Sequence, residues 1–260
     1  MNAPTPPHTS ASPGRVLYKI YAHTIALLLF VVVTIITALV TIIASFFGDK
    51  RYVSYYGPVW WSRITLWLFL LPVHVEGRDR LDPRQSYVFL ANHQGYFDIF
   101  LIYAWLGHNF KWMMKEYLRK IPFVGLACAR SGQIYVGDSL ASIGRAVRGA
   151  QSTLRGGMSM VIFPEGTRTH DGRLGTFRKG AFTLAGEIGL PIVPLTINGS
   201  FHVFNRHARS VSRGPLSLTI HQPITAEERQ GVPTRQLMKQ VFNTIDASLE
   251  PRFRTTVPAQ

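Results

Sequence analysis

The sequence has little of what many secreted and metal-dependent enzymes need. Cys128 is the only cysteine among the 260 residues, so no disulfide can form within the chain, as is usual for a domain that faces the cytoplasm. A zinc centre needs histidine, cysteine or carboxylate ligands at short spacing, but the sequence has no His-x-x-x-His and no cysteine pair. It also lacks Gly-x-Ser-x-Gly, a Walker loop and Gly-x-Gly-x-x-Gly. We therefore expect no metal and no cofactor, and assign Cys128 to core packing.

Acidic residues are also scarce, with 14 Asp and Glu against 28 Lys and Arg and a net charge of +14. Such a charge can serve nucleic-acid binding, but the basic residues are scattered and no nucleic-acid motif is present. Anionic lipid headgroups and phosphorylated ligands explain the positive charge better.

Charge is missing altogether from one long segment. From Ile25 to Phe47, 23 apolar or uncharged residues follow one another, enough to cross a bilayer. The run is too long for a signal-peptide core and has no convincing cleavage site, so we interpret it as an uncleaved anchor. Residues 1–14, which precede it, are rich in Pro, Ser and Thr and are expected to be a disordered tail.

A second apolar run follows from Val59 to Val73 and contains three tryptophans, which favour the membrane interface. Basic residues flank the first run on both sides, so the positive-inside rule gives no orientation; they are Arg15, Lys19, Lys50 and Arg51. This symmetry fits a re-entrant helical hairpin with both ends on the cytoplasmic face, and a full crossing is the alternative. We assign residues 15–75 to this membrane-embedded or interfacial two-helix segment.

Strand and helix patterns alternate over residues 76–260. Buried-strand patterns lie at Tyr87–Ala91, Phe110–Met114, Gln133–Val136, Met158–Phe163, Ile192–Asn198 and Leu216–His221. Helices are predicted at Phe97–Leu106, Ser139–Leu154 with Ser139 as its cap, Arg178–Ile188 and Thr234–Leu249. The alternation predicts an α/β domain with a mixed, mostly parallel sheet flanked by helices. Ligands in such folds gather at the carboxyl ends of the strands.

A histidine and an aspartate follow the first of these strands. His93 and Asp98 are five residues apart, so on one continuous helix they would lie about 140° apart and could not meet. They can meet if the chain turns at Gly95, with His93 just past the strand and Asp98 in the first turn of the next helix. The carboxylate would then fix the histidine tautomer and leave the other ring nitrogen free to take a proton.

A second loop follows the strand Met158–Phe163 directly and reads Pro164-Glu165-Gly166-Thr167-Arg168. Its glycine lets the backbone approach a ligand closely, and Arg168 offers a planar, permanently charged group suited to phosphate. Two such loops after two apolar strands indicate a shared ligand site.

These blocks resemble the 1-acyl-glycerol-3-phosphate (lysophosphatidic acid) acyltransferase family of the glycerolipid acyltransferase superfamily. Asn92, His93 and Asp98 match the first block, Asn-His-x4-Asp, and residues 163–168 match the third, Phe-Pro-Glu-Gly-Thr-Arg, without change. Further matches are Lys115-Glu116 with Ile121-Pro122-Phe123-Val124-Gly125, and the fourth block at Ile192-Val193-Pro194-Leu195. The blocks lie in the family's order and cover roughly Ser86 to Ser200.

The resemblance implies a membrane-associated O-acyltransferase that moves a fatty acyl group from acyl-CoA or acyl carrier protein to the sn-2 hydroxyl of lysophosphatidic acid, which gives phosphatidic acid. It implies His93 as general base, Asp98 as its partner, and an acceptor site at Lys115, Glu165, Gly166, Thr167 and Arg168. Asn92, Arg178 and Lys179 are weaker candidates. The implied location is the cell inner membrane with the active site on the cytoplasmic face, and the embedded two-helix motif agrees with this. Expected partners are the lysophospholipid, the acyl donor and membrane lipids, but no nucleic acid.

One departure concerns the acceptor. The family's second block usually ends in an arginine that contributes to phosphate binding, and here Asp138 stands at that position. Either Arg130 or Arg145 substitutes for it, or the acceptor differs, for example glycerol 3-phosphate or a lysolipid such as lyso-ornithine lipid. A non-catalytic membrane-binding protein is the alternative from another class, although a binding module has no use for the histidine–aspartate pair.

Overall fold

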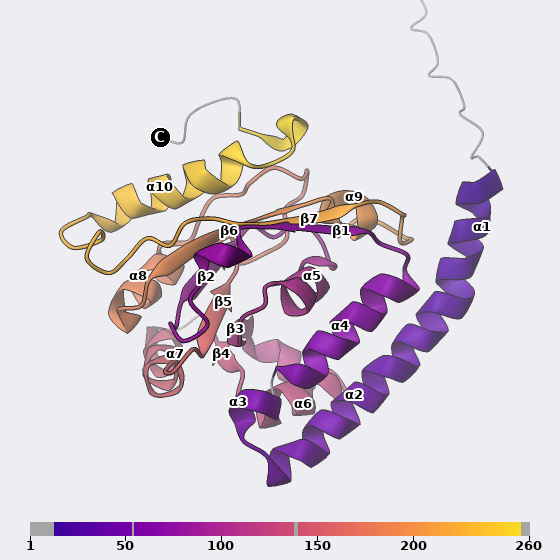
Figure 1. Cartoon of the computed structure of the whole chain (residues 1–260), viewed down its shortest axis with the longest axis horizontal. Coiled ribbons are helices and arrows are strands. Elements are labelled where there is room, and N and C mark those ends of the chain that lie inside the picture. Colours follow the sequence, from indigo (N-terminus) through magenta and orange to yellow (C-terminus); the bar gives the residue numbers. More distant parts are fainter. Residues whose placement is uncertain (1–12, 54, 138–139, 256–260) are drawn as a thin grey trace, which may run out of the picture.

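The structure is a computed structural model that describes residues 13–53, 55–137 and 140–255 (Figure 1). One β-sheet lies between two layers of helices, and a long N-terminal helix runs along the outside of one layer (Figure 1). The expected tail of residues 1–14 lies outside the described residues except for Pro13 and Gly14, which already belong to the first helix.

Seven strands form the sheet in the described part of the chain, in the order β1-β7-β6-β2-β5-β3-β4. They are β1 Val73–Glu76, β2 Val88–Ala91, β3 Phe110–Lys115, β4 Ile134–Val136, β5 Ser159–Ile162, β6 Ile192–Asn198 and β7 Leu216–Ile220. All neighbours are parallel except β6 and β7, which are antiparallel. The mixed, mostly parallel sheet predicted from the sequence is confirmed.

Side chains of the central strands alternate between two apolar cores. In β2, Phe89 and Ala91 join the core beneath α4 (Tyr56–Leu68) and α5 (Asp98–Trp105). Val88 and Leu90 join the opposite core, which is covered by α7 (Leu140–Thr153), α8 (Lys179–Ile188) and α10 (Thr234–Ala247). Because β2 is buried on both faces, its sequence is a continuous apolar run rather than an alternating one.

The N-terminal helix is a long apolar rod. It consists of α1 (Pro13–Tyr21), a π-helical turn (Ala22–Ala26) and α2 (Leu27–Phe47), 35 residues in all. Its most apolar stretch has a mean hydropathy of 3.0 and is only 17% buried, so the rod is long and apolar enough to cross a membrane.

A helical hairpin forms because the chain turns at α3 (Lys50–Val53) and α4 runs back along α2 (Figure 1). Trp61 donates from its indole to the Thr34 hydroxyl at 2.9 Å, which joins the two helices near mid-length. Tyr18 of α1 donates to the carbonyl oxygen of Phe69 at 2.9 Å, just past the end of α4. The beginning and the end of the hairpin are therefore held side by side.

The remaining differences from the sequence-based expectations are local. The second apolar run does not continue to Val73: α4 ends at Leu68, and Val73 begins strand β1, which the sequence pattern missed. Two short helices, α6 (Val124–Arg130) and α9 (Ser200–Phe204), were also missed because helices of one or two turns show too little periodicity. The predicted cap Ser139 lies outside the described residues.

Cys128 is half-buried in α6, where burial raises the pKa of its thiol to about 11. The thiol stays protonated at neutral pH, which agrees with its assignment to packing.

The direction of the strands determines where the predicted site lies. Strands β6, β2, β5, β3 and β4 all run the same way, so their carboxyl ends meet at one edge of the sheet. The chain leaves β2 at Asn92 and leaves the neighbouring β5 at Phe163. The two motif loops are therefore adjacent at that edge.

Candidate active site

The histidine–aspartate pair forms at the start of α5. His93 Nδ1 lies 2.6 Å from Asp98 Oδ2, and the Asp98 side chain is fully buried. The same oxygen also accepts the backbone N–H of Gly95 at 2.9 Å, and Asp98 is the first residue of the helix, where the helix dipole favours a carboxylate. Because Nδ1 is engaged, Nε2 is the nitrogen that can take a proton from a ligand. The predicted pairing across five residues is confirmed.

Gly95 allows the turn for a reason that differs from the expected one. Its backbone is not in the left-handed region, but a Cβ atom there would lie 2.6 Å from the carbonyl oxygen of Ser200. Tyr96 donates its backbone N–H to the carbonyl oxygen of Phe204 at 3.0 Å in the same contact. The glycine therefore lets the turn pack closely against α9.

The second loop holds His93 through its backbone. Glu165, which is 6% exposed, accepts the His93 backbone N–H at 2.7 Å through Oε1 and the Gly175 N–H at 2.8 Å through Oε2. The carbonyl oxygen of His93 in turn accepts the backbone N–H of Thr169 at 2.8 Å. These contacts favour a role for Glu165 in organising the two loops over the direct binding of the acceptor that the resemblance implies.

The carboxyl group of Glu165 has an altered acidity. Burial raises its pKa to about 7, although the N–H groups of His93 and Gly175 favour the carboxylate and oppose the shift. The nearby charges of Asp98 and Asp171 raise the pKa further.

An aromatic stack sets the plane of the His93 ring. The ring lies parallel to Phe163, with 3.9 Å between centroids and 8° between planes, and Phe163 in turn stacks on Trp112 of β3. The His93 side chain keeps 16% of its surface exposed. The imidazole is therefore fixed by Asp98 and Phe163, and one edge remains accessible.

Arg168 reaches back towards the first loop. Its guanidinium carbon lies 3.6 Å from the ring centroid of Tyr96, a cation–π contact that places the charge beside the turn between His93 and Asp98. Gly166 needs its left-handed backbone, with φ of 71°, and a Cβ atom there would lie 2.6 Å from Arg178 Nε. The structure therefore brings the Arg168 charge close to the histidine loop.

The other predicted site residues have more varied positions. Asn92 exchanges both of its amide hydrogen bonds with the backbone of Ile197 at the end of β6, so it fixes neighbouring strands. Arg178 donates to the carbonyl oxygens of Pro164 and Glu165 from the position before α8. Thr167 and Lys179 are exposed. Lys115 ends β3 at the same edge of the sheet, but β5 separates it from β2.

Of the two arginines considered as substitutes in the second block, the structure describes the side chain of Arg130. Arg130, at the end of α6, lies over the ring of Phe46 at 4.5 Å, beside the apolar rod. Asp138 lies outside the described residues, as does the side chain of Arg145.

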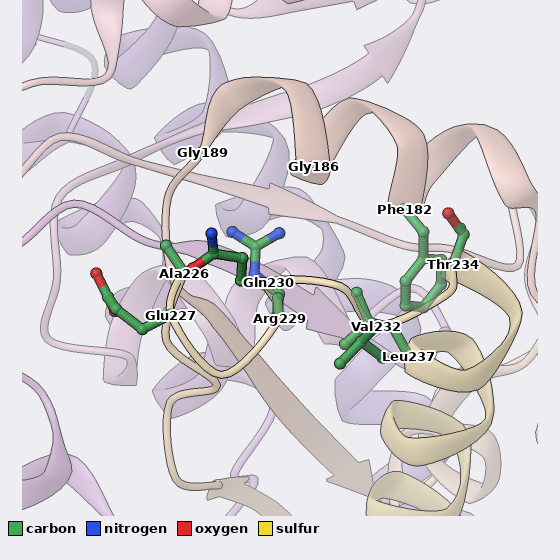
Figure 2. A pocket seen from close by; sticks show the side chains of 10 residues that line it. All are labelled: Phe182, Gly186, Gly189, Ala226, Glu227, Arg229, Gln230, Val232, Thr234 and Leu237. Atoms are coloured by element: carbon green, nitrogen blue, oxygen red, sulfur yellow. The ribbon is translucent and has the colours of Figure 1, made fainter.

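A surface pocket lies away from this site. Figure 2 shows Arg229 between the end of α8 and the start of α10, and its Nη2 donates to the carbonyl oxygen of Leu190 at 2.8 Å. Leu190 precedes β6, so the pocket lies at the amino end of that strand, opposite to the edge that carries His93. Arg229 joins two loops there and has no contact with the motif loops.

Sequence reasoning missed three side chains around the site. Tyr96 and Phe163 are inside the motifs, but nothing in their spacing predicts a ring beneath Arg168 or against His93. Arg206 comes from the loop after α9 and donates to His170 Nε2 at 2.7 Å and to the Arg168 carbonyl oxygen at 3.4 Å. No sequence signal could have placed it there.

Comparison with known proteins gives consistent matches over this region. Residues 72–198 match the model of the acyltransferase family. A chloroplastic 1-acyl-sn-glycerol-3-phosphate acyltransferase from Arabidopsis thaliana is 32% identical over 168 residues, which are 63% of this chain and 46% of the relative. The human 1-acyl-sn-glycerol-3-phosphate acyltransferase alpha is 29% identical over 166 residues, 62% of this chain and 58% of the relative. The chain spans about half the length of these curated relatives.

One solved structure has the same fold over most of both chains. It is the 1-acyl-sn-glycerophosphate acyltransferase from Thermotoga maritima, with a TM-score of 0.73 and 23% identity. The match covers 90% of this chain and 95% of that one, so the N-terminal helices and the sheet domain occur together in both.

The pKa of Glu165 predicts a pH-dependent stability. The folded pKa of about 7 exceeds the reference value of 4.5, so the protonated group stabilises the fold below about pH 4.5, and this contribution is lost as the pH rises through about 7. Relative to Glu165→Gln, which does not titrate, the wild type should lose melting temperature between about pH 5 and pH 8. Each unit of pKa shift corresponds to about 1.4 kcal/mol.

Thermal unfolding of both proteins across that pH range measures the difference. Glu187→Gln, at an exposed position of α8, is the matched control, and its difference from the wild type should stay constant. A constant difference for Glu165→Gln as well would contradict the raised pKa.

Proposed function

Since residues 72–198 match the model of the acyltransferase family, we propose that this chain is a membrane-associated O-acyltransferase that forms phosphatidic acid from lysophosphatidic acid. The acyl donor in this proposal is acyl-CoA or acyl carrier protein, and the acceptor group is the free sn-2 hydroxyl. The observation that supports it best is the pairing of His93 with Asp98 at the strand edge, beside the Arg168 loop. The names of the relatives support the same acceptor.

In the proposed reaction His93 acts as the general base. Its Nε2 takes the proton of the acceptor hydroxyl as the oxygen attacks the thioester carbonyl carbon. Asp98 stabilises the imidazolium that forms, because its buried carboxylate already accepts a hydrogen bond at Nδ1. The tetrahedral intermediate then collapses, the carbon–sulfur bond breaks, and the imidazolium returns its proton to the departing thiolate. The new ester and a free thiol are the products.

The phosphate of the acceptor is assigned to Arg168. Its guanidinium is permanently charged and offers the planar donor geometry that phosphate prefers. The contact with Tyr96 holds this charge near the histidine loop before a ligand binds, which reduces the entropy lost on binding. Gly166 and Thr167 form the exposed part of the same loop, and Lys115 supplies a second positive charge at the edge of the sheet.

A different acceptor is the alternative within the same chemistry. Asp138, in place of the arginine usual for the second block, favours glycerol 3-phosphate or a lysolipid such as lyso-ornithine lipid. A panel of acceptors assayed with purified protein and an acyl thioester distinguishes these substrates. Turnover on another acceptor but not on lysophosphatidic acid would keep the chemistry and change the substrate. No turnover on any acceptor would favour a non-catalytic membrane-binding protein.

The proposed location is the cell inner membrane with the active site on its cytoplasmic face. The exposed apolar rod supports insertion, and the contacts of Tyr18 and Tyr21 with the end of α4 support a hairpin whose two ends lie on the same side. Lysophospholipid would then reach the strand edge from the membrane.

Substitution of the base gives the first prediction for this function. His93→Ala should lower turnover by about 10²–10⁴-fold, because general-base catalysis contributes on that order. His74→Ala, at an exposed histidine of β1, is the control and should keep normal turnover. Thioester-dependent acylation of lysophosphatidic acid measures both, and near-normal turnover of His93→Ala would refute the base.

A second prediction distinguishes the contribution of the Arg168 charge from that of the Tyr96 ring on which the guanidinium lies. Arg168→Ala should raise the KM for the phosphorylated acceptor by about 10-fold or more, because a charged hydrogen bond is lost. Tyr96→Leu should raise the KM for the acceptor about 2- to 5-fold by removing the cation–π contact. Tyr96→Phe keeps an aromatic ring and should therefore keep the KM near its wild-type value. Steady-state kinetics with each substrate varied in turn measures these changes; an effect confined to the KM of the acyl donor would contradict the phosphate role.

A third prediction concerns topology. In a Cys128→Ser background, Arg15→Cys before the hairpin and Glu76→Cys after it should react with a membrane-impermeant maleimide from the same side. That side should be the cytoplasmic one, as judged with oriented membrane vesicles. Labelling of the two positions from opposite sides would exclude the hairpin arrangement.

A further inference from the structure

The loop between α9 and β7, residues 205–215, is strongly basic and contains no acidic residue. It carries Arg206, Arg209 and Arg213, and all three side chains are exposed. No aspartate or glutamate occurs in the sequence between Glu187 and Glu227, so no neighbour along the chain offsets this charge. The loop therefore presents a local positive surface.

This surface has a fixed shape although it contains no helix or strand. The Ser212 backbone N–H donates to the carbonyl oxygen of Val203 at 2.9 Å, and the His207 N–H donates to Asn205 Oδ1 at 2.9 Å. Val211 packs against the core beneath α4 and α5, the same core that Tyr18 of α1 contacts. The three arginines therefore lie on a loop that is held in place by hydrogen bonds and by the packing of Val211.

The loop joins the candidate active site to the apolar rod. At one end Arg206 donates to His170 Nε2 and to the carbonyl oxygen of Arg168. At the other end Val211 and Tyr18 of α1 pack against the same core, and the charge of Arg213 acts on the Tyr18 phenol. In Figure 1 the orange loop after α9 reaches the side of the sheet on which α1 lies.

Two more basic residues continue this surface on α1. Arg15 and Lys19 are exposed and one helical turn apart, on either side of Tyr18. Beyond Lys19 the rod has no Lys, Arg, Asp or Glu up to Phe47, and its outer side chains, such as Ile25 and Leu28, are 54% and 65% exposed. Positive charge therefore ends where the exposed apolar surface begins.

We propose that Arg15, Lys19, Arg206, Arg209 and Arg213 form one basic strip that binds the headgroups of anionic phospholipids. The strip lies along the junction between the apolar rod and the sheet domain, where headgroups would meet a partly inserted protein. This binding would lay the 205–215 loop on the membrane surface and hold the Arg168 loop above it. The inference rests on the proposed membrane attachment, and it adds a lipid selectivity outside the acceptor site.

The adjoining apolar surface favours a membrane over an acidic protein as the occupant. An acidic carrier protein would need only the positive charge. A bilayer needs positive charge at headgroup level and apolar side chains directly beyond it, and the strip and rod supply these in that order.

Lipid binding to the full-length protein in neutral detergent tests the proposal. The protein is titrated with fluorescent phosphatidylglycerol and, separately, with the same label on phosphatidylcholine. The wild type should prefer phosphatidylglycerol, and the double variant Arg209→Gln/Arg213→Gln should lose on the order of tenfold of that preference, given the contribution of each basic residue near an anionic surface. High salt should weaken the preference of the wild type.

The matched control is Arg235→Gln/Lys239→Gln. It removes the same charge from exposed positions of α10, on the opposite face of the sheet, and should keep the wild-type preference. If both double variants lost the preference for phosphatidylglycerol equally, the effect would come from net charge alone and the proposed lipid site would be refuted. Equal binding of both lipids by the wild type would also overturn it.

Further variants separate this proposal from the proposed function. The preference should persist in Arg168→Ala and in His93→Ala, because neither substitution touches the exposed arginines of the strip. A preference lost in Arg168→Ala but kept in Arg209→Gln/Arg213→Gln would place the lipid in the acceptor site and refute the proposal. If the strip variant loses affinity only for an acidic carrier protein, with lipid preference unchanged, the occupant is a protein and the proposal is wrong.

Discussion

The buried carboxylate of Glu165 connects the two loops on which the candidate site depends. It accepts one backbone N–H from the His93 loop and one from Gly175, while Thr169 returns a hydrogen bond to the His93 carbonyl. Burial of this group is costly unless its oxygens are satisfied, and each oxygen has one backbone donor. The position of His93, the proposed base, is therefore determined by a residue that need not touch the substrate. Burial at this position disfavours the charged form of Glu165 and therefore raises the pKa of its carboxyl group.

Around this link the parallel strands bring distant parts of the chain to one edge. Asn92 ties the end of β2 to Ile197 of β6, and Gly95 lets the next turn pack against α9. Phe163 fixes the plane of the histidine ring from the other neighbouring strand. The imidazole is thus oriented with the help of β5, β6 and α9, and each of their contact residues lies 70 or more positions after His93 in the sequence. Such preorganisation is what general-base catalysis requires, because little rearrangement is then needed when the acceptor binds.

The apolar rod and the strand edge that carries His93 are connected through packed helices. Tyr18 and Tyr21 hold the start of the apolar rod against the end of α4, and α4 packs on α5, the helix that begins with Asp98. The basic strip continues from the rod to the loop beside Arg168. A headgroup bound there would lie between the bilayer and the strand edge, which would favour transfer of a lipid acceptor from membrane to base without full exposure to water.

The sequence by itself determined the α/β class, the apolar rod, six of the strands and the adjacency of His93 with the Glu165 loop. These features depend on local patterns: apolar runs, helical spacing and polar residues directly after strands. Only the tertiary structure decided that Tyr96 lies beneath Arg168 and that Phe163 stacks on His93. It also decided that Asn92 forms hydrogen bonds with β6 and that Arg206 reaches the Arg168 loop. It also decided that Val73 begins β1, since a four-residue edge strand gains its hydrogen bonds from β7, more than 140 residues later. Contacts between residues far apart in sequence leave no periodic signal, because their distance is determined by strand order and packing rather than by spacing along the chain.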